Sequence, residues 1–147
     1  MKPLLNTILL FLLVIGFSGG VSGQDAPDFE ETKQRAEQGN AFAQYTLGLM
    51  YDNGFGVPEN NAEAVRWYRR AAEQGLSTAQ LSLGEKYAEG EGVPQNNVRA
   101  YVWYSVAAAQ GPLGASLRDR MADRLTPEQL ARGQDMATRC FESDYQD

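Results

Sequence analysis

The chain has 147 residues, with 13 Lys and Arg against 19 Asp and Glu, no His and one Cys, and its formal net charge is −6. Such an acidic chain is a poor ligand for nucleic acid or anionic lipid, because both are bound through clusters of Lys and Arg. Without His or a second Cys, the chain lacks the commonest general base, the usual metal ligands and an internal disulfide. The sequence therefore predicts no metal, no cofactor and no catalytic residue.

Residues 1–23 have the composition of a signal peptide. Lys2 precedes a mostly apolar stretch, residues 4–17, that is shorter than the roughly 20 apolar residues of a membrane-spanning helix. Small residues follow, and Val21 and Gly23 suit the −3 and −1 positions of a signal-peptidase site. We expect cleavage after Gly23 and a periplasmic or secreted protein that the membrane no longer holds. A cleavage after Gly20 and an uncleaved membrane anchor are the alternatives.

A single helix is predicted in residues 24–40, from Asp28 to Gln38. Its end, RAEQGNAFA, resembles the later segment AAEQGLSTA at residues 71–79, which belongs to a predicted second helix of a repeat. The polar Glu31 stands where that later helix has a tryptophan. A polar residue there suits the exposed end of a helical stack. We therefore interpret residues 24–40 as an N-terminal half-repeat.

An internal repeat follows. An offset of 36 residues aligns residues 43–78 with residues 79–114, and 18 of the 36 aligned pairs are identical. Ala, Leu and Tyr recur at every fourth residue in both copies, which is one stripe of a helix. Gly48 and Gly84 occupy the same place on this helix, although glycine lowers helix propensity by about 1 kcal/mol relative to Ala. This repetition predicts a close approach that a Cβ atom would block.

Each copy continues with G-x-G-V-P, which ends the first helix, and with a second helix. Asn60 is the predicted N-cap of the second helix, with Glu63 completing a capping box, and Asn96 repeats the cap without the acid. Alanines and aromatic residues share one face of this helix. We expect these aromatic side chains to lie in the core rather than to form a ligand platform. They are Trp67, Tyr68, Trp103 and Tyr104.

Two helices in each period of 36 residues predict an all-α fold, a right-handed α-solenoid of helix–loop–helix repeats. Its full repeats are expected at residues 41–76 and 77–112. Residues 113–147 are predicted to form a C-terminal capping hairpin and a tail. After residue 114 the apolar residues no longer fall at the helix positions that they occupy in the two repeats. The expected helices of this hairpin are residues 115–124 and a last helix that Thr126 caps, with Gln129 in a capping box and Cys140 buried near its end.

The motif A-Q-x-x-L-G-x-x-Y-x-x-G-x-G-V-P, followed by A-x-x-W-Y-x-x-A-A-x-Q-G, resembles the Sel1-like repeat, a relative of the tetratricopeptide repeat. The resemblance covers residues 28–114, and the LTPEQL segment is similar to the capping helix of short bacterial members. It implies an α-solenoid that acts as an adaptor between proteins. A cysteine-rich exported branch of the family is associated with penicillin binding and β-lactam hydrolysis. This chain lacks the paired cysteines of that branch and the Ser-x-x-Lys of serine β-lactamases.

The partner-binding surface is expected where the two copies differ, on the first helix of each repeat. In tetratricopeptide-like stacks this helix lines the concave groove. Apolar residues off the packing stripe of that helix favour the binding of a peptide or a partner helix. The alternative is that they make ordinary contacts with neighbouring helices. The predicted binding residues are Phe42, Tyr45, Leu49, Asp52, Thr78, Leu81 and Glu85.

The sequence thus predicts an exported, monomeric adaptor that presents a groove to a protein partner and carries out no chemistry of its own. Two alternatives remain open. One is an envelope enzyme that binds penicillin or hydrolyses β-lactams. The other is a structural subunit that stacks with copies of itself, although polar residues at both predicted ends weigh against open-ended stacking.

Overall fold

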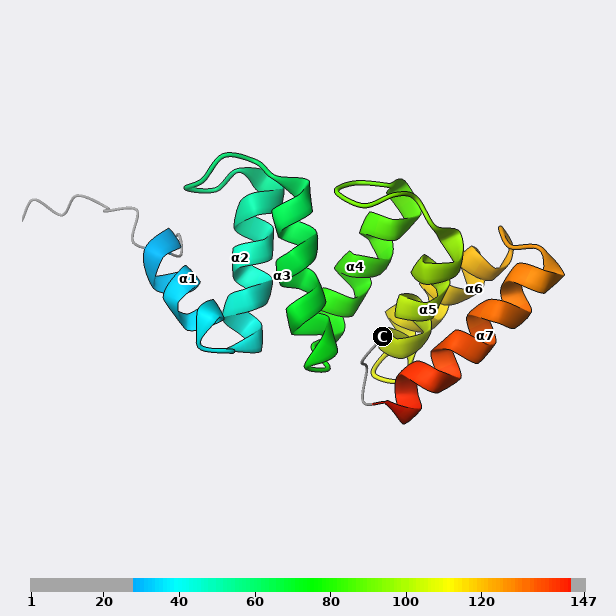
Figure 1. The fold of residues 1–147 in the computed structure, drawn as a ribbon. Coiled ribbons are helices and arrows are strands. Elements are labelled where there is room, and N and C mark those ends of the chain that lie inside the picture. Colours follow the sequence, from blue (N-terminus) through cyan, green and yellow to red (C-terminus); the bar gives the residue numbers. More distant parts are fainter. Residues whose placement is uncertain (1–27, 144–147) are drawn as a thin grey trace, which may run out of the picture.

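The computed structural model describes residues 28–143, which form seven helices and no strand (Figure 1). The helices follow one another along the molecule, and α2 packs against α3, α3 against α4 and α4 against α5. The fold is therefore the predicted helical solenoid. The predicted signal peptide and the end of the tail lie outside the described residues. The helices are α1 (Phe29–Glu37), α2 (Ala41–Asn53), α3 (Asn61–Glu73), α4 (Ser77–Glu89), α5 (Asn97–Ala108), α6 (Pro112–Ala122) and α7 (Pro127–Glu142).

Asparagine side chains begin the second helix of each repeat, as predicted. The Oδ1 atom of Asn60 accepts a hydrogen bond from the Glu63 N–H at 3.1 Å, and Asn96 caps α5 in the same way. The capping box predicted for Asn60 and Glu63 does not form. The Asn60 N–H donates to the Tyr51 carbonyl at 2.7 Å, and the Glu63 carboxylate accepts from Arg66 at 2.9 Å. The Asn60 N–H and the Glu63 carboxylate, which the capping box would join, thus each have another hydrogen-bond partner.

The glycine shared by both copies makes room for an aromatic ring. A Cβ atom on Gly48 would lie 2.6 Å from a ring carbon of Tyr68, and one on Gly84 would lie 2.6 Å from a ring carbon of Tyr104. The predicted close approach is therefore confirmed, and the group that approaches is a buried tyrosine of the next helix. All four aromatic residues predicted to lie in the core do so, and the Arg70 guanidinium lies over the most exposed of them, Trp67, at 4.5 Å.

Buried glutamines join one repeat to the next. The Gln44 side chain donates to the Ala36 carbonyl at 3.1 Å, and Gln80 makes the equivalent bond to Ala72 at 3.1 Å. Gln74 then donates to the Gln44 side chain at 2.7 Å. Each of these carbonyls also accepts a bond from the N–H of the glycine that follows its helix, at 3.0 Å for Ala36 and 2.9 Å for Ala72, so the glutamine adds a second, buried hydrogen bond at the end of the helix. This explains why the repeat places a polar residue beside its apolar stripe.

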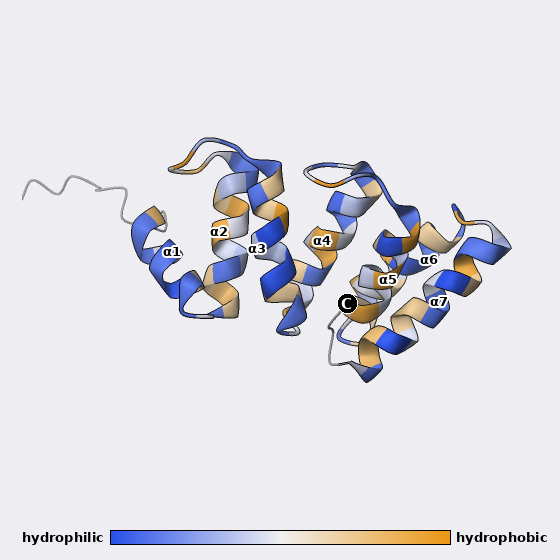
Figure 2. Ribbon diagram, viewed as in Figure 1, coloured by the Kyte–Doolittle hydropathy of each residue, from blue (hydrophilic) through white to orange (hydrophobic). Residues whose placement is uncertain are grey.

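The C-terminal helices differ from the predicted hairpin. Helix α6 begins at Pro112, three residues before the expected start, and α7 runs from its Thr126 cap, where the predicted capping box forms. Both helices pack on α5, and they have few contacts with each other. Ala137 and the buried Cys140 of α7 pack on two valines of α5, which gives α7 its own apolar contact away from α6. Polar and apolar residues share every helix, as surface helices of a thin solenoid require (Figure 2).

Candidate partner-binding groove

The predicted binding residues divide into exposed and half-buried positions. Phe42 is 70% exposed, and Thr78 and Glu85 are exposed as well. The remaining four lie half-buried between the helices. The Tyr45 ring packs on Tyr68 with the ring centroids 5.6 Å apart, and the two leucines pack on the main core cluster. These apolar residues therefore take part in helix packing, which was the alternative to a binding role.

Asp52 has a structural partner on each of the next two helices. Its carboxylate accepts a hydrogen bond from the Tyr68 hydroxyl at 3.0 Å and forms an ion pair with Lys86 at 2.5 Å. Lys86 is only 7% exposed and also pairs with Glu91 at 2.7 Å. Its ammonium lies 3.3 Å from the side-chain oxygen of Asn61. This cluster closes the junction of α2 and α4, and the sequence analysis missed it because Lys86 has an apolar counterpart, Met50, in the first copy.

The electrostatics of this cluster keep its groups in their hydrogen-bonding forms. Burial lowers the pKa of Lys86, but the hydrogen bonds and charges of Asp52 and Glu91 outweigh that effect and raise this pKa above its usual value. Burial, together with the charge of Asp52, raises the pKa of Tyr68 far above its usual value. The lysine therefore stays charged and the phenol stays a donor.

The next junction, between α4 and α6, is open where the first is closed. Ala88 stands one repeat after Asp52, and Ala122 stands one repeat after Lys86. These two alanines cannot rebuild the ion pair. A cavity of about 190 Å³ lies at this junction instead. Its lining residues come from α4, α5, α6 and the turn after α6, and they are Glu85, Ala88, Glu89, Tyr104, Leu117, Arg120, Met121 and Arg124.

Opposite charges face this cavity from its two sides. Glu85 and Glu89 lie one turn apart on α4, whereas Arg120 lies in the last turn of α6 and Arg124 in the turn that follows α6. Within residues 28–143, no ion pair joins any of these four side chains to another group. The cavity is thus a groove with an acidic wall and a basic wall. We name it the α4–α6 groove.

Tyr104 lies beneath this groove as a neutral phenol. Burial and the nearby Glu85 and Glu89 raise its pKa to about 12, although Arg120 and Arg124 partly offset this rise. In the described part of the chain, its hydroxyl has no hydrogen-bond acceptor, whereas its repeat equivalent Tyr68 donates to a carboxylate. The groove therefore combines a free phenol donor with two arginines.

The α4–α6 groove agrees only in part with the sequence prediction. Of the seven predicted binding residues, Glu85 alone lines it. Sequence reasoning missed Arg120, which was assigned to a polar end of the stack, and Arg124, which was expected only as the end of the helix at residues 115–124. A usable signal was present in the sequence, because the two acidic residues are four positions apart and so are the two basic residues.

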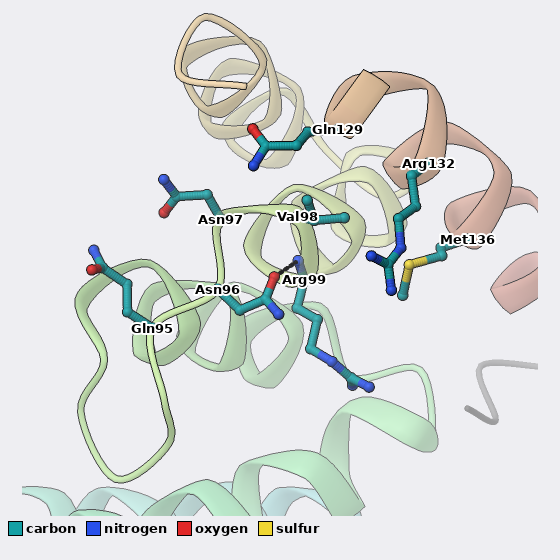
Figure 3. A pocket seen from close by; sticks show the side chains of 8 residues that line it. All are labelled: Gln95, Asn96, Asn97, Val98, Arg99, Gln129, Arg132 and Met136. Atoms are coloured by element: carbon teal, nitrogen blue, oxygen red, sulfur yellow. Dashed lines mark hydrogen bonds between the residues drawn. The ribbon is translucent and has the colours of Figure 1, made fainter. Parts of the chain in front are cut away.

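A second cavity of about 400 Å³ lies between the start of α5 and α7 (Figure 3). Its polar side chains do not converge. Gln95 and Asn97 point to one side, and Arg99 and Arg132 lie on the other. Asn96 points inward but already accepts a hydrogen bond from the Arg99 N–H at 3.0 Å. This cavity therefore offers no set of groups aimed at one ligand.

Two further features are absent from the described residues. Residues 28–143 hold no cluster of three or more potential His, Cys, Asp or Glu ligands that is arranged for a metal ion. In that same span, the helices are too short or too polar to traverse a bilayer.

Comparison with known proteins places the repeat in a family. The Sel1 repeat model matches residues 41–76 and 77–112. A protective antigen of uropathogenic Escherichia coli that displays an SLR fold superposes with a TM-score of 0.75 and 32% identity, over 80% of this chain and 26% of the antigen. A Sel1 repeat protein from Oxalobacter formigenes superposes with a TM-score of 0.56 and 41% identity, over 56% of this chain and 63% of that one.

A curated relative is far larger than this chain. A chitin synthase regulator of Malassezia restricta is 37% identical over 57 residues, which are 39% of this chain and 4% of the regulator. The likeness therefore covers only a short part of the regulator. It extends to neither the activity nor the partners of the whole regulator.

Proposed function

Because the chain contains two Sel1 repeats, which typically serve as protein-interaction modules, we propose that it is an adaptor that binds a protein partner in the α4–α6 groove. The observation that carries the proposal is the contrast between the two helix junctions. The first is closed by the Asp52–Lys86 ion pair, and the second leaves a cavity of about 190 Å³ between unpaired acidic and basic side chains. An exposed, unfilled groove with directed polar groups suits a binding surface.

We further propose that the adaptor is exported and works in the bacterial envelope. The support is the sequence of residues 1–23, with its basic start, short apolar stretch and small residues before Gln24. The intact mass of the protein recovered from its host tests this directly. A chain that begins at Gln24 is the expected result, and a chain that retains residues 1–23 would contradict it.

A cross-linked pull-down from the envelope fraction tests the adaptor function. The bait is the full chain as its host processes it, compared with a Glu85→Ala/Arg120→Ala variant. Both substituted side chains are exposed, so the fold should survive, and circular dichroism checks this. The matched control is Arg132→Ala, which removes an exposed arginine from α7 away from the groove.

The expected result is a partner that the wild type and the control enrich and the groove variant loses. A partner retained by all three would move the binding surface elsewhere. Recovery of no partner would overturn the adaptor proposal.

A further inference from the structure

We propose that the α4–α6 groove binds an Asp or Glu side chain of the partner, followed in the partner by a Lys or Arg. The proposal rests on the adaptor function and specifies the chemistry of its partner. Its basis is a comparison of the two helix junctions. At the first junction a carboxylate of the chain lies between a phenol and a cation, and at the second junction the phenol and the cations lack such a carboxylate.

The first repeat shows the completed arrangement. The Asp52 carboxylate lies between the Tyr68 hydroxyl, at 3.0 Å, and the Lys86 ammonium, at 2.5 Å. A carboxylate thus accepts a hydrogen bond from a phenol and pairs with a cation where α2 and α4, the first helices of the two repeats, meet. Charge-assisted hydrogen bonds of this kind are the stronger class in proteins.

The second junction keeps the phenol donor and has two arginines as its cations, but it lacks the carboxylate. Tyr104 repeats Tyr68, whereas Ala88 replaces the aspartate and leaves the hydroxyl without an acceptor among the described residues. Arg120 and Arg124 line the opposite wall and take the place of the buried lysine as a source of positive charge. An acidic side chain from outside would restore the missing partner.

The acidic wall accounts for the second residue of the motif. Glu85 and Glu89 line the same cavity and would repel an isolated carboxylate. In an extended peptide, successive side chains point in opposite directions, so an acidic residue facing α6 places its neighbour against α4. A Lys or Arg at that position would pair with Glu85 or Glu89. The groove is therefore complementary to an acidic–basic pair in an extended segment.

Titration with short peptides, followed by amide chemical shifts in NMR spectra of the full chain, tests this binding. The probe is acetyl-Ala-Ala-Asp-Lys-Ala-Ala-amide, and its control replaces Asp by Asn. A third peptide carries Asn and a free C-terminal carboxylate, so that it distinguishes a side-chain carboxylate from a chain end. The method suits the weak affinity of so short a ligand.

With the Asp peptide, we expect shifts around residues 85–89 and 120–124. We expect about fivefold weaker binding for the Asn peptide, because the charge-assisted bonds are lost. Equal binding of the Asp and Asn peptides would overturn the proposal. Tighter binding of the free-carboxylate peptide would overturn the assignment to a side chain.

Two tyrosine variants form a matched pair. Tyr104→Phe removes the hydroxyl beneath the groove and should weaken binding of the Asp peptide about threefold, since one hydrogen bond to a charged group is lost. Tyr68→Phe removes the equivalent hydroxyl one repeat earlier, outside the groove, and should leave binding unchanged. If Tyr104→Phe bound the Asp peptide as tightly as wild type, the phenol would not be part of the site.

The charges are tested separately with Arg120→Gln/Arg124→Gln, which removes both positive charges and keeps both exposed side chains polar. We expect at least about fivefold weaker binding of the Asp peptide. Failure of the peptides to bind, combined with a groove-dependent partner in the pull-down, would overturn this inference and leave the adaptor function standing. Failure of the pull-down would overturn the adaptor function itself.

Discussion

Equivalent residues of the two repeats keep the same place but take different roles. Tyr68 and Tyr104 both pack against a glycine of the preceding helix, yet among the described residues only Tyr68 finds a carboxylate to which its hydroxyl donates. The difference follows from one substitution, Asp52 in the first copy and Ala88 in the second. A repeat therefore fixes the backbone and core, while single side chains decide whether a junction is closed or open.

Lys86 should be one of the most important polar residues for stability. Lys86→Met introduces the residue that the first copy has at this position and leaves Asp52 without its cation. We expect a loss of about 2 kcal/mol in the free energy of unfolding, because a partly buried charge loses its partner. Urea denaturation measures this loss. The double variant Asp52→Asn/Lys86→Met should lose less than the sum of the single variants, and additive losses would show that the pair is not coupled.

The buried phenol of Tyr104 should make stability depend on pH in alkaline solution. Its pKa is raised to about 12, whereas an unfolded chain has a tyrosine pKa of about 10. A folded-state pKa above the unfolded one favours folding fully below pH 10, and this contribution is lost as the pH rises from 10 to 12. Tyr104→Phe should therefore flatten the fall in melting temperature over this range. An unchanged profile would show that other groups cause the fall.

At the scale of helices, the beginnings of α3 and α5 look alike in sequence but differ in their surroundings. The side-chain oxygen of Asn61, at the start of α3, lies 3.3 Å from the Lys86 ammonium. Asn97 repeats it at the start of α5, but Ala122 replaces the lysine, and the buried Oδ1 atom of Asn97 has no hydrogen-bond partner within residues 28–143. The Asn97 oxygen thus lacks the lysine contact of Asn61, because the repeat pattern ends before residue 122.

Alanine substitutions at the two asparagines should therefore have unequal effects. Asn61→Ala removes a hydrogen bond to a charged group and should cost about 1 kcal/mol of unfolding free energy. Asn97→Ala removes an acceptor that is buried but unsatisfied, so the cost should be close to zero or the variant slightly more stable. Thermal unfolding of both variants under one condition compares them. Equal losses would mean that the lysine contact adds nothing to stability.

The elements themselves were largely predictable from the sequence. Periodic alanines and aromatic residues, asparagine caps and the G-x-G-V-P loops are local signals, and they placed α2 to α5 correctly. The packing of α6 and α7 was not predictable, because it depends on which helix offers α7 an apolar face. That face is formed by Val102 and Val106 of α5, where Ala137 and Cys140 pack. Local patterns also could not show that Asp52 points to a lysine 34 residues later, since that contact is set by the stacking of repeats.

At the scale of the whole molecule, both ends of the array are polar. Glu30 and Glu31 are exposed on α1, and the α7 surface carries an exposed ion pair between Asp135 and Arg139 at 2.8 Å. A solenoid grows by burying the apolar face of one repeat against the next, so charged outer helices block further addition. The molecule has the features of a finished array rather than of a unit in a filament.

We therefore expect the protein to be a monomer that does not stack with itself. Multi-angle light scattering over a concentration series should give the mass of one chain throughout, because association would have to bury the charged faces of α1 and α7 without matching partners. A control series at high salt screens repulsion between the acidic molecules. A mass that rises with concentration at both salt levels would contradict this expectation and favour the self-stacking subunit. The same preparation, incubated with a fluorescent penicillin, should show no covalent labelling, and a labelled band would instead favour the penicillin-binding alternative.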